Sequence, residues 1–279
     1  MHDCEKAVLI AGAGHSGSTL LGLVLGASSA VFYAGEARKS TFIGDEKKPE
    51  KKRVCKLCGP SCPIWGGFRL APGVHLYDEL TRRTGRRIIV DSTKSREWIE
   101  PQIASLKRQG TPMAMVLLTR DGRAVVNSRL RKYPSISARE HAARWLEQIR
   151  AAEELAQRFP GHVTRLRYEE LASNPESSIR RVAEELGIAF EQAMLEPWTT
   201  EQHPLGGNNG TQFLFARERN KESSIIELTD KTRAHYGDHP RGFVLDLRWR
   251  SEMSPQALAD FEAEVGSGNH TYAWNEETR

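Results

Sequence analysis

The stretch that decides the fold is Gly12-Ala13-Gly14-His15-Ser16-Gly17-Ser18-Thr19. It follows the apolar run 7–11 and leads into the apolar run 20–25. This order predicts a buried strand, a glycine-rich turn and a helix. Such a turn presents backbone N–H groups and a helix N-terminus to an anion, so the stretch predicts a phosphate-binding loop.

The loop has the glycine spacing of an NTPase P-loop, GxxxxGK[ST], but Ser18 occupies the position of the lysine. Without that lysine, little is left in the loop to hold a β,γ-phosphate pair. The loop therefore favours a single phosphate over a triphosphate.

Length and composition limit the class of protein. The chain has 279 residues, of which 39% are hydrophobic, and a formal net charge of +4, which suits an anionic ligand but is too weak to indicate nucleic acid. We predict one domain over residues 1–279. No apolar run approaches the roughly 20 residues that cross a membrane, and the polar start 1–6 does not resemble a signal peptide. We therefore expect a cytoplasmic protein.

The rest of the chain alternates between strand-like and helix-like patterns. Apolar or alternating runs predict strands at 88–90, 113–118 and 163–168, and periodicity and capping signals predict helices over 74–84, 137–155, 174–187 and 254–265. This alternation predicts an α/β fold with a P-loop-like parallel sheet flanked by helices.

Two stretches do not fit this alternation. The charge-dense segment 45–56 predicts an exposed or mobile stretch, which belongs to a cysteine-containing insertion around 45–66. The stretch 197–241 has little periodicity and many Gly, Asn, Arg and Lys residues, which predicts long loops that form a lid over a site.

Three of the four cysteines, Cys55, Cys58 and Cys62, lie close together. A structural zinc site needs four ligands, and the only other cysteine, Cys4, is distant in sequence, although His75 could complete a set. A CxxC pair alone is a moderate signal, and a disulfide is disfavoured in a reducing cytoplasm. We therefore predict a Gly/Pro-rich loop with packed or free thiols and no metal.

Four polar clusters follow the predicted strands, and they are the loop 12–19, then 91–94, 119–121 and 168–170. Ligands of parallel α/β sheets bind beyond the carboxyl ends of the strands, so we expect all four at one rim. In the third cluster, Arg120 is followed eight residues later by Ser128. An arginine fork and a serine hydroxyl can together bind a phosphate, although a solvated basic helix would show the same residues.

Taken together, these motifs resemble the sulfotransferases that use 3′-phosphoadenosine 5′-phosphosulfate (PAPS), in particular bacterial members. The 5′-phosphosulfate loop of that family reads [KR]SG[ST]T, and residues 15–19 match it except at His15. Its 3′-phosphate motif has the spacing of Arg120 and Ser128. The run 35–38 resembles a GE-containing segment of several branches, and segments 55–65, 91–94, 203–208 and 245–265 also look like bacterial members.

The resemblance implies the sulfotransferase fold and PAPS as the donor, with PAP (3′-phosphoadenosine 5′-phosphate) as the product and no metal required. It implies that the loop, by Gly14, His15, Ser16, Gly17, Ser18 and Thr19, holds the 5′-phosphate. Arg120 and Ser128 would hold the 3′-phosphate at a second, well-separated anion pocket. Tyr168, at the end of a predicted strand, would lie beside the adenine, although it could equally be a half-buried strand aromatic.

The same resemblance indicates how transfer would be catalysed. Glu36 is the candidate general base for the acceptor hydroxyl. His15 stands where the family has a cation, and an anionic phosphosulfate would raise its pKa; alternatively Lys94 supplies the cation. Gln212 stands near a position where relatives carry arginine, which Arg217, Arg219 or Lys221 could replace.

Three functions remain open from the sequence. The first is a PAPS-dependent sulfotransferase acting on a hydroxyl of a small molecule, glycan or lipid. The second is a P-loop-like kinase or NTPase, for which Asp91 could bind Mg²⁺. The third is a PAP-binding protein without turnover. The acceptor and the oligomeric state are not readable from the sequence.

Overall fold

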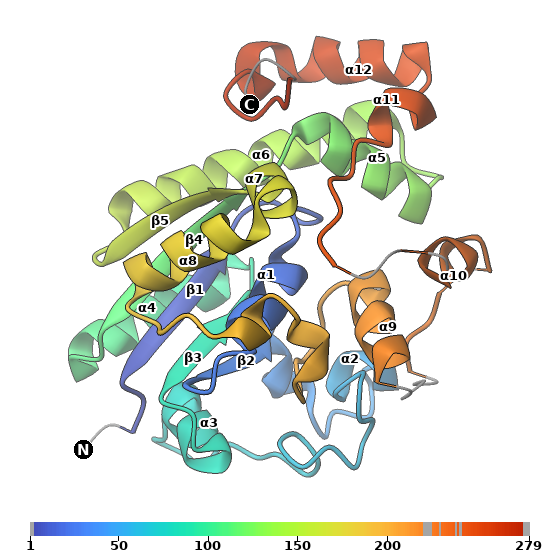
Figure 1. Ribbon diagram of the computed structural model, residues 1–279. Helices are drawn as coiled ribbons and strands as arrows, with labels where there is room; N and C mark the ends of the chain where they lie inside the picture. Colours follow the sequence, from blue (N-terminus) through green and yellow to red (C-terminus); the bar gives the residue numbers. More distant parts are fainter. Residues whose placement is uncertain (1–2, 220–224, 229, 238, 240–241, 276–279) are drawn as a thin grey trace.

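The computed structural model describes residues 3–219, 225–228, 230–237, 239 and 242–275. Its centre is a five-stranded parallel sheet in the order β2-β3-β1-β4-β5 (Figure 1). The strands are β1 (Lys6–Ala11), β2 (Val31–Gly35), β3 (Ile88–Asp91), β4 (Met113–Thr119) and β5 (His162–Arg167). All four pairings are parallel, so the carboxyl ends of the strands share one rim, as the sequence predicts.

Helices cover both faces of the sheet because the side chains of a strand alternate between its faces. Val8 and Ile10 of β1 pack in the cluster that contains residues of α1 (Ser18–Leu25) and α8 (Pro175–Leu186). Leu9 and Ala11 pack on the opposite face, with residues of α4 (Arg96–Gln109) and α6 (Ala138–Arg158). The result is the expected three-layer α/β/α arrangement (Figure 1).

Several helix ends form where the sequence signals predict. Ser137 and Glu140 form a reciprocal capping box at the start of α6. Pro175 is the first residue of α8, and Gly187 ends that helix in the left-handed conformation. The remaining α-helices of the described residues are α2 (Glu50–Arg53), α3 (Leu76–Thr84), α5 (Gly122–Lys132), α7 (Tyr168–Ser173), α9 (Asn209–Glu218), α10 (Asp230–Gly237), α11 (Trp249–Glu252) and α12 (Pro255–Val265).

The structure differs from the sequence expectations in several places. Within the segment 45–56, which was expected to be exposed, residues 54–56 are buried. Strand β2 was not expected; all five of its residues are buried at an edge of the sheet beside β3. The stretch 197–241, expected to be long loops, contains α9 and α10. Tyr168 is the first residue of α7, one position beyond β5, rather than the end of a strand.

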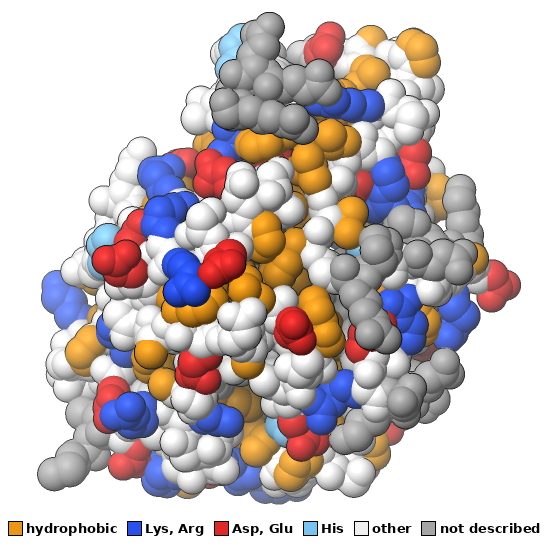
Figure 2. All heavy atoms as spheres, viewed as in Figure 1, with side chains coloured by type: hydrophobic (Ala, Val, Ile, Leu, Met, Phe, Trp, Pro, Cys, Tyr) orange, Lys and Arg blue, Asp and Glu red, His pale blue; other side chains and the backbone are white. Residues whose placement is uncertain are grey.

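The distribution of charged side chains on the surface agrees with the net charge of +4. On the face drawn in Figure 2, basic and acidic side chains are interspersed and do not gather into a single basic stripe. Among the described residues, no helix combines the length and the apolar character that crossing a bilayer requires.

Candidate functional site

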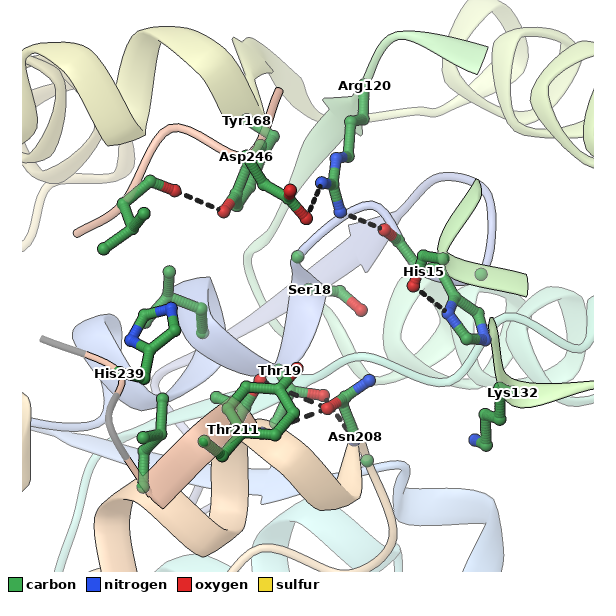
Figure 3. Close-up of a pocket in the computed structure, with 18 of the residues that line it drawn as sticks. His15, Ser18, Thr19, Arg120, Lys132, Tyr168, Asn208, Thr211, His239 and Asp246 are labelled. Atoms are coloured by element: carbon green, nitrogen blue, oxygen red, sulfur yellow. Dashed lines mark hydrogen bonds and ion pairs between the residues drawn. The ribbon is translucent and has the colours of Figure 1, made fainter. Parts of the chain in front are cut away.

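A cavity of about 700 Å³ lies at the carboxyl rim of the sheet (Figure 3). It brings together the predicted site residues Gly14, His15, Gly17, Ser18, Thr19, Glu36, Lys94, Arg120, Ser128 and Tyr168. Ser16 is buried in the same loop and is not part of the lining. The convergence of residues that follow all five strands is what the parallel sheet predicts.

Two walls of the cavity are distinguished below. The loop wall consists of residues 14–19 with Arg120, Ser128 and Tyr168. The Glu36 wall consists of Glu36, Gly207 and Asn208. Figure 3 shows Arg120 and Tyr168 on one side of the cavity and Asn208 on the other. The Asn208 amide joins the walls by donating to Thr19 Oγ1 at 2.9 Å.

The loop has the backbone shape of an anion-binding turn. His15 has φ 73° and Gly17 has φ 93°, both in the left-handed region, and alternation of such conformations turns successive N–H groups toward one point. The N–H groups in the first turn of a helix have no intrahelical partner. In α1 no side chain caps them at Gly17. The Ser16 hydroxyl is buried without a partner among the described residues. The first-turn N–H groups, which face the cavity with Ser18 and Thr19, can receive an anion.

Lys94 supplies the ammonium group that the loop itself lacks. It follows β3, and its Nζ donates to Ser18 Oγ at 2.6 Å and to the Ser92 carbonyl at 3.2 Å. Burial lowers the pKa of Lys94, although the Glu36 and Asp91 carboxylates oppose this effect. Ser18 occupies the loop position where an NTPase P-loop has its lysine, and the Lys94 ammonium, which comes from the segment after β3, contacts this serine.

Arg120 lies directly against the loop. Its Nη1 donates to the His15 carbonyl at 2.9 Å, and its Nη2 donates to Asp246 Oδ2, also at 2.9 Å (Figure 3). Its guanidinium stacks 4.3 Å from the ring centre of Tyr168. The Tyr168 ring also packs on Gly17, where a Cβ would come within 2.6 Å of it. Tyr168 therefore fixes the arginine and the loop relative to each other.

His15 connects the loop to α5. Its Nδ1 lies 2.8 Å from Ser128 Oγ, and its ring contacts Tyr133 edge-on. Burial, followed by the charges of Lys132 and three further cations, lowers the pKa of His15 to about 3. His15 is therefore neutral near pH 7. Because Arg120 and Ser128 both contact this residue, the expected second anion pocket adjoins the loop and is not well separated from it.

Glu36 lies across the cavity, at the end of β2. Its Oε2 pairs with Lys39 Nζ at 2.7 Å, and its Oε1 accepts a hydrogen bond from the Gly207 amide at 3.3 Å. Burial raises the pKa of Glu36, but the Lys39 charge and hydrogen bond, with help from Lys94 and Gly207, outweigh it and leave the pKa lowered. The group is therefore a carboxylate at neutral pH.

Asp91, the candidate ligand for Mg²⁺, does not line the cavity. Its Oδ1 accepts hydrogen bonds from the amides of Ala37 and Thr93. Its Oδ2 accepts from the Tyr77 hydroxyl and the Trp98 indole. This carboxylate organises the carboxyl ends of β2 and β3, and its acceptor positions are already used.

The candidate replacements for an arginine near Gln212 do not reach the cavity. Gln212 is fully buried and donates to the Gly206 carbonyl. Arg217 donates to the carbonyls of Tyr236 and Gly237, and Arg219 to that of Thr199. Lys221 lies outside the described residues.

The sequence interpretation missed other charged residues of the cavity. Lys132, Asp246 and Arg248 all line it. The Asp246 carboxylate lies between Arg120 and Arg248; burial raises its pKa, but its hydrogen bonds and ion pairs with these two arginines outweigh burial and leave the pKa well below its usual range. Only Lys132 had a local signal, because it lies one helical turn after Ser128 on α5.

Known proteins that resemble this chain are sulfotransferases. A model described as the sulfotransferase family matches residues 102–192, which include β4, Arg120 and Ser128. The sulfotransferase domain from the curacin biosynthetic pathway superposes with a TM-score of 0.55 at 18% identity, over 96% of this chain and 98% of that one. The chain has the sulfotransferase fold. The resemblance that the two sequence motifs indicate is thereby confirmed.

A second solved structure has the same sulfotransferase fold. The sulfotransferase domain from the Synechococcus PCC 7002 olefin synthase gives a TM-score of 0.54 at 18% identity, with coverage of 99% of this chain and 97% of that one. A search of curated proteins by sequence finds no match.

Proposed function

We propose that this chain transfers a sulfuryl group from PAPS to a hydroxyl group of an acceptor. One observation carries the proposal: an anion-binding loop, a lysine, an arginine–serine pair and a carboxylate all face one cavity. PAPS carries its phosphosulfate and its separate phosphate on the same ribose. Two anion sites that adjoin each other, as the loop and Arg120 do, fit that donor.

The residues of the loop wall fit the two ends of the donor. The first-turn N–H groups of α1, with the hydroxyls of Ser18 and Thr19 that line the cavity, would hold the 5′-phosphate. Arg120 and Ser128 would hold the 3′-phosphate. The Nε of Arg120 is buried without a partner among the described residues, and its Nη2 already binds the Asp246 carboxylate. A phosphate at this site would compete with Asp246 for the arginine.

The chemistry then divides between the two walls. PAPS supplies an activated sulfuryl group: the acceptor oxygen forms a bond to sulfur, and the bond from sulfur to the 5′-phosphate oxygen breaks with its electron pair leaving on PAP. Glu36 takes the proton of the acceptor hydroxyl. Lys94, held at Ser18, offsets the charge that develops on the leaving phosphate.

His15 fits a positioning role better than that of the catalytic cation. It is neutral because of its burial and the surrounding cations. Its carbonyl holds Arg120, and its ring holds Ser128. Tyr168 likewise supports Arg120 by stacking. Both residues would keep the 3′-phosphate site at a fixed distance from the loop.

The kinase or NTPase alternative has less support. It needs a carboxylate free to hold Mg²⁺, and four donors already engage Asp91. The alternative of a binding protein without turnover would leave the convergence of Lys94 and Glu36 on the cavity unexplained.

The test compares PAP with AMP, which lacks only the 3′-phosphate, by calorimetry on the wild-type chain and on Arg120→Met. Wild type should bind PAP more tightly than AMP. Because hydrogen bonds to charged groups contribute about 1.5–3 kcal/mol, Arg120→Met should weaken PAP binding by roughly 10–100-fold and leave AMP binding nearly unchanged. Arg180→Met, on the exposed surface of α8 and outside the cavity lining, serves as the control and should behave as wild type.

Other results would contradict the proposal. Tighter binding of ATP with Mg²⁺ than of PAP would favour an NTPase. Binding of PAP without transfer of labelled sulfate from PAPS to any member of a panel of phenols, glycans and hydroxylated lipids would favour a protein without turnover.

A further inference from the structure

The three clustered cysteines meet a histidine from a distant part of the chain. The Sγ atoms of Cys55, Cys58 and Cys62 and a ring nitrogen of His203 all lie within 4.8 Å of one another. His203 Nδ1 lies 3.1 Å from Cys58 Sγ and 3.6 Å from Cys62 Sγ. The fourth ligand that the sequence interpretation sought is therefore His203, not His75 or Cys4.

Local backbone turns bring the three sulfur atoms together. Gly59, with φ 77°, donates its amide to the Cys55 carbonyl at 2.7 Å, which folds Cys58 back toward Cys55. The Cys62 amide then donates to the Gly59 carbonyl at 3.3 Å. His203 is held beside this turn because its carbonyl accepts a hydrogen bond from the Trp65 indole. Backbone hydrogen bonds and the Trp65 contact thus help to bring the four groups together.

We propose that Cys55, Cys58, Cys62 and His203 bind one Zn²⁺ ion in a structural site. Thiolate and imidazole ligands suit zinc, and structural zinc sites have four protein ligands in a tetrahedron. With Zn–S bonds of about 2.3 Å, the sulfur atoms of such a tetrahedron lie about 3.8 Å apart, which is within the 4.8 Å that spans this cluster. A disulfide would use only two of the four converging groups.

Burial strengthens the case for an occupied site. Cys55 is fully buried, Cys62 is 2% exposed, and Trp65 beside them is also 2% exposed. Binding changes no oxidation state: each cysteine thiol gives its proton to solvent as its sulfur bonds the metal, and His203 binds through a neutral ring nitrogen. Since all four positions are filled by protein, the ion has no open position for a substrate, and its role is structural.

The site would fix the Glu36 wall. Leu205, two residues after His203, pairs in β-bridges with both Cys55 and Gly35. The Glu36 amide donates to the Leu205 carbonyl at 2.7 Å. Two residues further, the Gly207 amide reaches the Glu36 carboxylate. Zinc would therefore clamp the cysteine turn to the segment that orients Glu36.

A second contact reinforces the same connection. Lys56, next to Cys55, is buried, and its Nζ donates to the Gly207 carbonyl at 3.2 Å and to Asn209 Oδ1 at 2.5 Å. Leu57 packs against the cluster that contains Phe213 of α9. The start of α9 thus depends on the position of the cysteine turn.

The experiment measures metal in the full-length chain by mass spectrometry of the elements, after purification without added chelator. We expect about one zinc per chain. Replacement of zinc by Co²⁺ should give the absorption bands of a tetrahedral cobalt–thiolate site. Cys58→Ser and His203→Asn should each lose most of the zinc and the cobalt bands.

Matched controls use the remaining cysteine and the histidine that the sequence suggested. Cys4 contacts the Lys6 carbonyl, and His75 caps α3; neither belongs to the cluster. Cys4→Ala and His75→Gln should therefore keep a full zinc complement. A strong chelator should lower the melting temperature of the wild type and of these controls, and should have little effect on Cys58→Ser, which has already lost the ion.

Three results would overturn the zinc site. The first is wild-type protein that holds no zinc after refolding with the metal, the second is iron–sulfur absorption with stoichiometric iron, and the third is a disulfide among these cysteines detected by peptide mapping. None of these readouts involves PAP, so the inference and the proposed function can fail separately.

Discussion

The loop wall and the Glu36 wall face each other across one cavity, but different contacts hold them in place. The loop wall lies on central strands: β1 leads into the loop, and β4 ends beside Arg120, with hydrogen bonds to neighbouring strands on both sides. The Glu36 wall lies at the edge strand β2 and depends on the β-bridges that join Leu205 to Gly35 and to Cys55, and on side chains such as Lys56. The position of Glu36 therefore depends on contacts with the cysteine turn and with the segment around Leu205, which are distant from each other in the sequence.

This difference gives each wall its own sensitivity. The loop wall is held by the main chain of the sheet core, so single substitutions there should alter binding more than shape. The Glu36 wall is held by the distant segment around Leu205, by side chains and, by our proposal, by a metal ion, so substitutions there should alter catalysis while donor binding persists. The following variants test that contrast.

The largest expected effect is at the Glu36 wall. Glu36→Gln keeps the shape of the side chain and its hydrogen bond from Gly207 but cannot take a proton. We expect kcat to fall by about 10²–10⁴-fold, the usual contribution of a general base, with PAP affinity unchanged. Steady-state kinetics and calorimetry on the same protein check both parts. A fully active Glu36→Gln would remove Glu36 from the mechanism.

The next largest effect distinguishes Lys94 from His15 as the catalytic cation, since both residues line the cavity. Lys94→Met removes the ammonium at Ser18 and should lower kcat by about 10²–10³-fold, as for loss of one donor that stabilises transition-state charge. His15→Gln removes a neutral ring and should chiefly weaken PAP binding through Arg120 and Ser128. Measuring kcat and the Kd of PAP for both variants shows which residue is the catalytic cation. If His15→Gln lowers kcat and Lys94→Met only weakens PAP binding, His15 is the cation.

The smallest effect concerns pH. The catalytic form of Glu36 is the carboxylate, which is present above its pKa and lost as the pH falls through it. Since Lys39 lowers that pKa, Lys39→Met should raise it and move the acid limb of the kcat/KM profile to higher pH, with little change near pH 7. Lys47→Met, an exposed lysine of the same region, is the control. An unshifted acid limb would assign the profile to another group.

Local sequence signals predicted the central part of this fold correctly. Strands β1, β3, β4 and β5 have apolar or alternating runs, and helices α6 and α8 have capping signals that their structures use. Strand β2 was missed because a run of five buried residues has no alternation to distinguish it from a helix segment. Helix α9 was missed because its only local signal is the capping Asn208.

The sequence likewise predicted some residues of the candidate site and missed others. Arg120, Ser128 and the loop 12–19 follow predicted strands, so the parallel rule was enough to place them together. Asp246 and Arg248 reach the cavity from a segment with no such relation to the sheet. His203 joins Cys55, Cys58 and Cys62 across more than 140 residues, and no spacing rule covers a ligand at that separation.

The sequence by itself determined the class of the protein, because a glycine turn after an apolar strand and an arginine–serine spacing are local patterns that fix backbone and helix geometry. Only the tertiary structure decided that Lys94 contacts Ser18 of the loop, that His15 is buried among cations and that His203 lies beside the three cysteines. Each of those outcomes depends on the distance and burial of groups far apart in the chain, which only packing sets.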